Sequence, residues 1–284
     1  MIMTSRPTRF GIALLGQGSV AQLAEEARRA EQIGFDVVLL PDHLGMTAPL
    51  PPLVAMALAA PSVRVSNLVL NSNFYRPALL ARDLASVGSA TGGRLEIGLG
   101  TGYVEAEFTA AGLPFQRGRA RVDLLTEHVT ELRRLLSSPD HVPAAVQSPP
   151  PIMVAGVGDR LLAMAAQHAD IIGIATMRDR AHLAERIRYV KAQAGDRFDD
   201  IELEFSFFQT SIDDPDDLST LHMLAPDASA SELRQLVTFL GGSVTEAADQ
   251  IRSLREEFGI SYFTFNLTPS AGWETLEKIV AAVK

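Results

Sequence analysis

Short apolar runs alternate with longer amphipathic segments along almost the whole chain. Most of the runs are continuous blocks of apolar side chains rather than alternations of apolar and polar ones. Such blocks are typical of parallel strands that are covered on both faces. The eight runs are Phe10–Leu15, Val37–Leu40, Val65–Leu70, Leu95–Leu99, Ile152–Ala155, Ile171–Ala175, Leu203–Phe208 and Tyr262–Phe265.

The segments between the runs repeat their apolar residues with the 3.6-residue period of an amphipathic helix. The clearest stripe consists of Val122, Leu125, Val129, Leu132 and Leu136. Pairs with capping-box spacing mark several helix starts, namely Ser19 with Gln22, Ser229 with Glu232 and Ser243 with Glu246. Eight strand–helix units in 284 residues predict a single α/β domain over residues 1–284, a (β/α)8 TIM barrel.

A doubly wound open sheet is the alternative arrangement of the same units. It would carry a phosphate-binding glycine fingerprint directly after the first strand. The segment Gly16-Gln17-Gly18 supplies two glycines, but Gln22 and Leu23 stand where a third is required. The barrel is therefore favoured. Two long connections, 137–151 and 210–227, are typical of surface loops, and the second is long enough to fold over the barrel mouth.

Composition excludes several classes of function. The chain has no cysteine, which excludes disulfides, thiolate nucleophiles, Fe–S clusters and cysteine-ligated zinc. The net charge is -9 and no block of basic residues occurs, so a nucleic-acid partner is not expected. Apolar runs stay below the roughly 18 residues that a membrane span needs, and the N-terminus lacks a signal-peptide pattern. We therefore expect a cytoplasmic protein that uses neither a membrane nor nucleic acid.

In a barrel, functional residues gather at the C-terminal ends of the strands. Asp42 and His43 follow the second run, where a carboxylate beside an imidazole can orient and tune a proton donor. The other interpretation is a loop aspartate that caps a turn beside an exposed histidine. Asn67 interrupts the third run, either as a satisfied core amide or as an amide directed into the barrel at a ligand.

Two small-residue turns follow later strands. Gly100-Thr101-Gly102-Tyr103 lies after the fourth run, and its glycines let a flat ligand approach the backbone, unless they form only a tight turn. Residues 155–158 open a helix whose free N–H groups favour an anion, and Thr176 can join that site. The alternative is that Asp159 satisfies those groups itself. The histidine spacing fits no metal-site pattern, so no metal is expected.

Taken together, these positions resemble a luciferase-like flavin or deazaflavin oxidoreductase over nearly the whole chain. The most specific match is the Thr-Gly-Gly-Arg-x-x-x-Gly-x-Gly-x-Gly run at 91–102, followed by Ala155-Gly156 with the helix at 161–170. Residues 239–266 resemble the C-terminal part of that family. The resemblance implies a luciferase-like barrel with redox chemistry at a tricyclic ring. Asp-His after the second strand is similar to the branch that uses coenzyme F420, an 8-hydroxy-5-deazaflavin, whereas other members use FMN and activate oxygen.

The resemblance also implies roles for individual residues. His43, oriented by Asp42, is the expected proton donor. A non-proline cis peptide bond is expected at Asn67–Leu68, behind the coenzyme ring. The residues expected to bind the coenzyme are Asn67, Leu68, Leu70, Gly100, Thr101, Gly102, Tyr103, Ala155, Gly156, Val157, Gly158 and Thr176.

Three functional hypotheses follow. The first is an F420-dependent reductase that transfers a hydride from reduced F420 to a C=C or C=N bond of a small molecule. Related sugar-phosphate dehydrogenases carry glutamates where this chain has Tyr103 and the small and amide residues of 16–22, so oxidation of a sugar phosphate is not favoured. The second is an FMN-dependent monooxygenase that works with a separate flavin reductase. The third is a barrel that binds a ligand without turnover. Separately, the family resemblance implies a homodimer.

Overall fold

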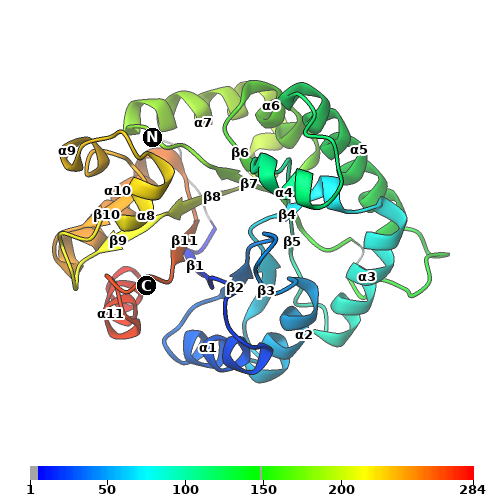
Figure 1. The fold of residues 1–284 in the computed structure, drawn as a ribbon, viewed down its shortest axis with the longest axis horizontal. Helices are drawn as coiled ribbons and strands as arrows, with labels where there is room; N and C mark the ends of the chain where they lie inside the picture. Colours follow the sequence, from blue (N-terminus) through cyan, green and yellow to red (C-terminus); the bar gives the residue numbers. More distant parts are fainter. Residues whose placement is uncertain (1–5, 148) are drawn as a thin grey trace.

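The computed structural model describes residues 6–147 and 149–284 as a ring of parallel strands surrounded by helices (Figure 1). Nine strands form one sheet in the order β3-β2-β1-β11-β8-β7-β6-β5-β4. The strands are β1 Arg9–Ala13, β2 Val37–Leu40, β3 Arg64–Asn67, β4 Leu70–Asn71, β5 Ile97–Gly100, β6 Ile152–Gly156, β7 Ile171–Ile174, β8 Glu202–Phe207 and β11 Tyr262–Asn266.

The ring closes where the two ends of this strand order meet. The N–H of Val65 in β3 donates to the carbonyl of Arg94 at 2.9 Å, and the N–H of Glu96 donates to the carbonyl of Val65 at 2.9 Å. Further along, Leu70 and Asn71 of β4 pair in register with β5. Since β3 also pairs with β2, these contacts complete a barrel, and the predicted (β/α)8 architecture is confirmed.

Helices connect the strands and cover the outside of the barrel (Figure 1). The helices that cover it are α1 Val20–Gln32, α2 Leu50–Ala59, α3 Pro77–Ala90, α5 Gly118–Leu136, α6 Asp159–His168, α7 Arg180–Ala194, α10 Val244–Phe258 and α11 Trp273–Val283. Shorter helices lie in the connections, namely η1 Ser72–Phe74, α4 Glu105–Ala110, η2 Gly195–Asp200, α8 Ser219–Leu224 and α9 Ala230–Leu233. Ser19, Ser229 and Ser243 form the capping boxes that the sequence predicts.

A small second sheet was not expected from the sequence. Residues Gln209–Ser211 (β9) pair in parallel with Phe239–Gly241 (β10) beyond the end of β8. The long connection at 210–227 therefore begins as a strand and continues into α8. It is held to the segment after β11, because the N–H of Gly272 and the hydroxyl of Thr275 both donate to the carboxylate of Asp213.

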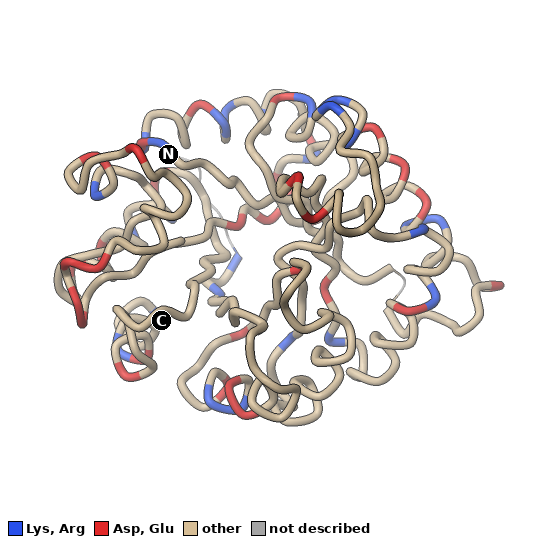
Figure 2. Tube along the Cα trace, in the orientation of Figure 1, with Lys and Arg blue, Asp and Glu red and all other residues tan. Residues whose placement is uncertain are grey.

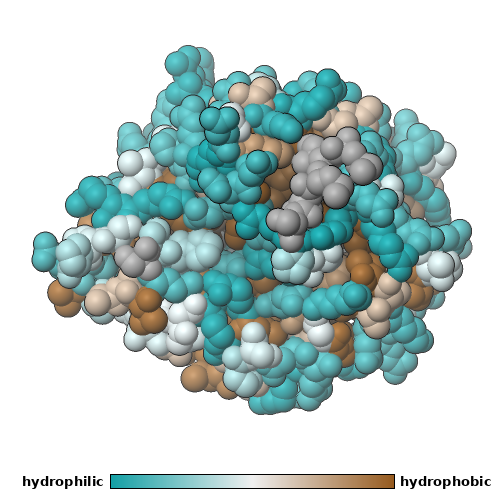
Figure 3. Space-filling model, turned by 180° about the vertical axis from the view of Figure 1, so that it is seen from behind, coloured by the Kyte–Doolittle hydropathy of each residue, from teal (hydrophilic) through white to brown (hydrophobic). Residues whose placement is uncertain are grey.

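Charged residues lie mainly on the surrounding helices, with a few on the strands at the centre of the ring (Figure 2). From behind, the surface is mostly hydrophilic, and hydrophobic residues appear there in separate areas (Figure 3). Among the residues that the structure describes, none of the helices has the length and apolar character needed to cross a bilayer.

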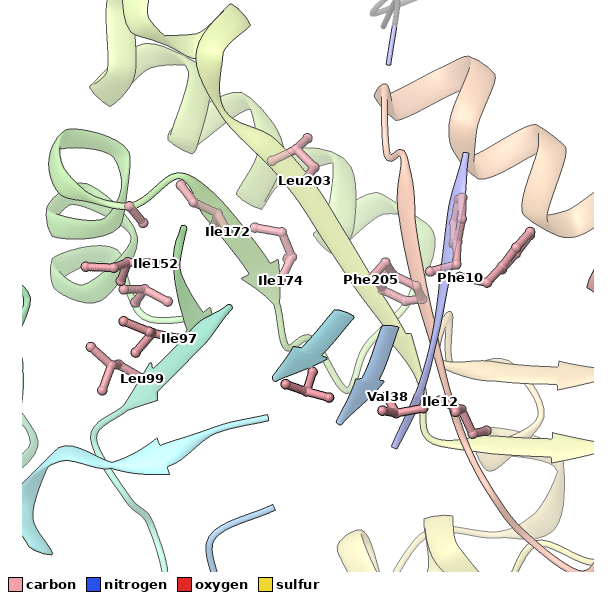
Figure 4. Close-up of a cluster of buried hydrophobic side chains, with 14 of the residues drawn as sticks. Phe10, Ile12, Val38, Ile97, Leu99, Ile152, Ile172, Ile174, Leu203 and Phe205 are labelled. Carbon is pink, nitrogen blue, oxygen red and sulfur yellow. The ribbon is translucent and has the colours of Figure 1, made fainter. Parts of the chain in front are cut away.

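The main hydrophobic core lies between the outer face of the barrel and the helices (Figure 4). Successive side chains of a strand alternate between its two faces, so every second strand residue points into this layer. Phe10 and Ile12 of β1 and Val38 of β2 are fully buried in it. Ile97, Leu99, Ile152, Ile172, Ile174, Leu203 and Phe205 extend it around the ring.

The inside of the barrel has a charged floor near the N-terminal ends of the strands. The Arg9 guanidinium is 2.6 Å from the carboxylate of Glu96 and 2.6 Å from that of Glu202, and it also lies over the Tyr262 ring at 4.0 Å. Arg64 contacts Glu96 from β3 at 2.6 Å. Strand alternation places small inward residues nearer the mouth, namely Ala13, Gly100, Ala155, Gly173 and Ser206.

The third predicted strand, Val65–Leu70, is interrupted, and this corrects the sequence-based boundaries. A non-proline cis peptide bond lies between Leu68 and Val69, at the bulge that separates β3 from β4. The bulge presses against β5, where a Cβ atom on Gly98 would collide with the carbonyl oxygen of Asn67. A Cβ on Gly100 would lie 2.5 Å from Cγ2 of Val69. Glycines in β5 are therefore required by the bulge.

We expect Gly98→Ala to lower the free energy of unfolding by about 3 kcal/mol, because backbone must move to admit the methyl group. Gly88→Ala is the matched control, since a Cβ there would meet no atom within 4 Å and the residue lies inside α3. It should be neutral or stabilising by about 0.5–1 kcal/mol. Urea unfolding measures both. Equal stability of the two variants would contradict the packing of the bulge on β5.

The stability of the barrel should also depend on pH through Glu204, which is fully buried on the inner face of β8. Burial raises the pKa of Glu204 to about 7 from an ordinary 4.5. Because the folded pKa is raised, the stabilising contribution is fully present below about pH 4.5 and is lost as pH rises through 7. The full loss corresponds to about 3 kcal/mol. Unfolding of the wild type and of Glu204→Gln between pH 5 and 8.5 measures it; parallel pH curves would contradict the raised pKa.

Candidate functional site

The strand ends bring most of the predicted site residues onto one arc of the barrel rim. Asn71 pairs with Gly100 across β4 and β5, and Gly156 pairs with Ile174 across β6 and β7. The side-chain amide of Asn73 donates to the carbonyl of Thr101 at 2.9 Å. From β2 to β7 the arc covers four strand spacings, or about 19 Å along the rim. An elongated ligand can therefore contact both ends of the arc.

At one end of the arc, His43 is held by a residue that the sequence analysis did not identify. Its Nδ1 lies 2.7 Å from Oε1 of Glu107, on α4, and both side chains are mostly buried. The ring of Tyr103 meets the imidazole edge-on with the centroids 5.7 Å apart. The available signal was that Glu107 closely follows the Gly-Thr-Gly turn, on the short helix that begins there.

Asp42 does not orient His43 through a hydrogen bond as predicted. Its carboxylate instead accepts hydrogen bonds from the N–H of Asn71 and the hydroxyl of Tyr75, both at 3.0 Å. The reason is its position beside β4, whose free N–H is within reach of the Asp42 carboxylate. Burial raises the pKa of Asp42 despite these donors. Asp42 therefore joins the end of β2 to the start of η1, and Glu107 orients the imidazole.

The His43–Glu107 pair has the geometry of a proton donor. A carboxylate only accepts hydrogen bonds, so Nδ1 of His43 carries the hydrogen and Nε2 is left to exchange a proton with a ligand. When Nε2 is protonated as well, the adjacent carboxylate stabilises the positive charge of the imidazolium. Among the described residues, no group of three or more His, Asp or Glu side chains is placed to hold a metal ion.

The structure corrects three expectations about the third strand. The cis bond is at Leu68–Val69 and not at Asn67–Leu68, because the Leu68 N–H still donates to Leu40 at 3.0 Å and keeps the ladder regular to that point. Asn67 has the same strand parity as Val65, so its amide faces the helices, where neither amide atom has a hydrogen-bond partner among the described residues. Leu70 is buried in the outer core, not at the mouth.

The bulge itself does face the inside of the barrel. Leu68 and Val69 pack against the inner cluster that contains Ala13, Leu39 and Met153. The glycines of β5 serve this packing, so they do not leave backbone open to a flat ligand as the sequence suggested. Gly102 is different from them, because its φ of +64° is a conformation that favours glycine, and a Cβ there would meet the side-chain amide of Asn71.

At the other end of the arc, the start of α6 is open and has no side-chain cap. Gly158 precedes the helix, and a Cβ on it would meet no atom within 4 Å. Asp159 pairs with Arg186 instead of the helix N–H groups, which rules out the self-capping alternative. The free N–H groups of a helix start attract anions.

A hydroxyl and a guanidinium lie near this helix start, and the guanidinium of Arg186 is paired with Asp159 and Glu185. Thr176 is buried, and its Oγ1 lies 2.6 Å from Nδ1 of His182. Burial lowers the pKa of His182, and the nearby guanidinium groups of Arg178 and Arg186 lower it further. Residues 156–158 and Thr176 therefore form a place that fits a phosphate.

A cavity of about 700 Å³ opens beside His43, between the rim and the outer loops. Its mostly apolar walls come from residues 42–46, 48–49, 73–76, 111, 113–114 and 116, together with Leu124. Arg76 is the cationic side chain in the lining. Thr101 and Gly156 lie on the same rim but outside this cavity, so the predicted residues do not all share one chamber.

Comparison with known proteins places this geometry in a family. Residues 1–257 match the family model described as luciferase-like monooxygenase. The chain belongs to the luciferase-like monooxygenase family. This membership confirms the resemblance that was based on residues 91–102 and 155–170.

Individual relatives match only part of the chain, at moderate sequence identity. The chain is 34% identical over 125 residues to an F420-dependent glucose-6-phosphate dehydrogenase of Intrasporangium calvum, covering 40% of this chain and 37% of that protein. It is 32% identical over 108 residues to a 5,10-methylenetetrahydromethanopterin reductase of Methanolobus tindarius, covering 38% and 33%. The aligned part is thus about a third of the length of either relative.

Among solved structures, an F420-dependent secondary alcohol dehydrogenase in complex with an F420–acetone adduct has a similar fold, with a TM-score of 0.78. The alignment covers 98% of this chain and all of that one at 20% sequence identity. At that identity the likeness shows the fold, which agrees with the closed parallel barrel described above.

We expect Glu107→Ala to change the tautomer of His43, because Nδ1–H then loses its acceptor. Nitrogen-15 shifts of the imidazole at pH 8 should show mainly Nδ1–H in the wild type and a larger share of Nε2–H in the variant. Glu105→Ala, an exposed carboxylate on the same short helix, is the control and should resemble the wild type. A wild type that is mainly Nε2–H would refute the assigned hydrogen bond.

Proposed function

We propose that this protein is an F420-dependent oxidoreductase that acts as a reductase on a weakly charged small molecule. The observation that carries the proposal is the His43–Glu107 pair at the wall of a largely apolar cavity. The F420-dependent glucose-6-phosphate dehydrogenase named above supports the choice of F420. The His43–Glu107 pair at one end of the rim and the uncapped start of α6 at the other support it independently.

The residues present fit an elongated anionic coenzyme. The uncapped start of α6 leaves free N–H groups above open space at Gly158, and Thr176 adds a hydroxyl. Gly156, Val157, Gly158 and Thr176 would hold the phosphate, while Thr101, Gly102 and Tyr103 would border the ring. When bound, the reduced coenzyme supplies a hydride from its carbon at position 5.

The chain supplies binding, orientation and a proton. His43 protonates the substrate through Nε2, and Glu107 keeps the imidazole in place and stabilises its charged form. Leu44, Met46 and Leu113 give the cavity an apolar wall that would cover the reacting groups of a bound substrate. Such a lining suits a conjugated C=C or a C=N bond better than a sugar phosphate, which needs several cations.

An FMN-dependent monooxygenase is the second candidate, favoured by the family model itself. An open helix start with a nearby hydroxyl can hold the phosphate of FMN as well as that of F420. The homodimer that the family resemblance implies and the expected location in the cytoplasm stay predictions.

The first experiment separates the coenzymes. We expect saturable quenching of F420 fluorescence when the purified protein is added, and weaker or no binding of FMN under the same conditions. Saturable FMN binding without a response to F420 would replace the proposed function by the second candidate.

His43→Ala should then retain F420 binding but lower turnover of reduced F420 by at least about 100-fold with a conjugated enone or a cyclic imine as acceptor. His222→Ala, an exposed histidine on α8, is the matched control. Unchanged turnover in His43→Ala would remove this residue from the mechanism.

A further inference from the structure

Glu204 is a buried carboxyl that the proposed mechanism does not use. It points into the barrel from β8, and Oε1 accepts a hydrogen bond from the hydroxyl of Ser206 at 2.6 Å. Ser206 is the next inward residue toward the mouth on the same strand. The carboxyl is therefore one layer below the rim of the barrel.

Gly173 on β7 makes room for this carboxyl beneath the predicted coenzyme site. A Cβ on Gly173 would lie 2.7 Å from Oε2 of Glu204 and 2.9 Å from the Cβ of Ala155. Ala155 is half-buried at the end of β6, directly before the residues that fit a phosphate. Glu204 thus lies under the small-residue part of the rim that an entering coenzyme would cover.

Glu204 has no cation of its own among the described ion pairs. Arg9 is the nearest positive charge from β1, but its guanidinium is already engaged by Glu96 and Glu202. β11 contributes the uncharged Tyr262 and Thr264, and the Thr264 hydroxyl lowers the pKa of Glu204.

The remaining neighbours of Glu204 do not neutralise it. From β7 it faces Gly173, which carries no charge, and from its own strand it faces Ser206 and the anionic Glu202. The nearby negative charge of Glu202 opposes ionisation of Glu204, whereas the Ser206 and Thr264 hydroxyls and the charge of Arg9 favour it, but burial outweighs them. A negatively charged ligand placed above this carboxyl would add a second opposing charge.

We propose, on the basis of the proposed function, that Glu204 is a proton-binding residue of the coenzyme site and takes up a proton when an anionic coenzyme enters the barrel mouth. In the free protein the pKa of Glu204 is about 7 because of burial. Near neutral pH the carboxyl is then about half protonated, and binding drives it toward the neutral form. Neutral Glu204 removes a negative charge from below the ligand and can donate a hydrogen bond.

The test measures protons rather than turnover. Calorimetric titration with F420 at pH 7, in two buffers of different ionisation enthalpy, gives the number of protons taken up on binding. We expect the wild type to take up about half a proton more than Glu204→Gln. Ionisation of F420 itself contributes equally to both proteins, so it cancels in the difference. At pH 5.5 the difference should disappear, since Glu204 is then already neutral.

Two further variants complete the design. Glu256→Gln, an exposed carboxylate on α10, is the matched control and should behave as the wild type. Ser206→Ala keeps the carboxyl but removes the hydroxyl that lowers its pKa, so its proton uptake should move to higher pH. This variant answers the question if Glu204→Gln does not fold.

The outcomes separate the two proposals. F420 binding with equal proton uptake in the wild type and Glu204→Gln, or an unchanged pH profile in Ser206→Ala, overturns the role of Glu204 and leaves the proposed function intact. Failure of the wild type to bind F420 overturns the proposed function, and this inference with it.

Discussion

The close approach of the bulge at Leu68 and Val69 to β5 is the constraint on which the rest of the site depends. The space that a side chain on Gly98 would fill is occupied by the carbonyl of Asn67, and the space beside Gly100 is occupied by the side chain of Val69. Because β3 and β4 straddle the bulge, the barrel can close through both while the strand shifts its direction between them. The inner wall at this depth consists of backbone and of the apolar side chains of Leu68 and Val69.

Hydrogen bonds that begin at the bulge position the residues of the barrel rim. The N–H of Asn71 is presented just past the bulge and is taken by Asp42, which ties the end of β2 to β4. His43 is thereby fixed opposite α4, where Glu107 reaches Nδ1. Glu107 thus holds the imidazole of His43 electrostatically, whereas Asp42 has the structural task of joining two strands.

Charge is distributed unevenly along the barrel axis. At the floor, Arg9 and Arg64 are shared among carboxylates, which satisfies most of the buried charge. One layer higher, the close partners of Glu204 are uncharged hydroxyls, those of Ser206 and Thr264. A carboxyl in that position responds to any charge brought to the mouth, whereas paired groups at the floor are held by their partners. The barrel therefore combines a floor of paired charges with a layer above it that contains the titratable carboxyl of Glu204.

Local pattern along the chain was sufficient to determine the eight strand–helix units, the capping boxes and the rim positions of His43, Thr101 and Gly158, because strand parity and helix period are local properties. It also carried the family resemblance. Only the tertiary structure decided which side chains meet. Glu107 rather than Asp42 reaches His43 since helix α4 folds back over the rim, and Asn67 faces outward since the strand bends only after Leu68. Such contacts depend on the direction of elements far apart in sequence, which no local pattern records.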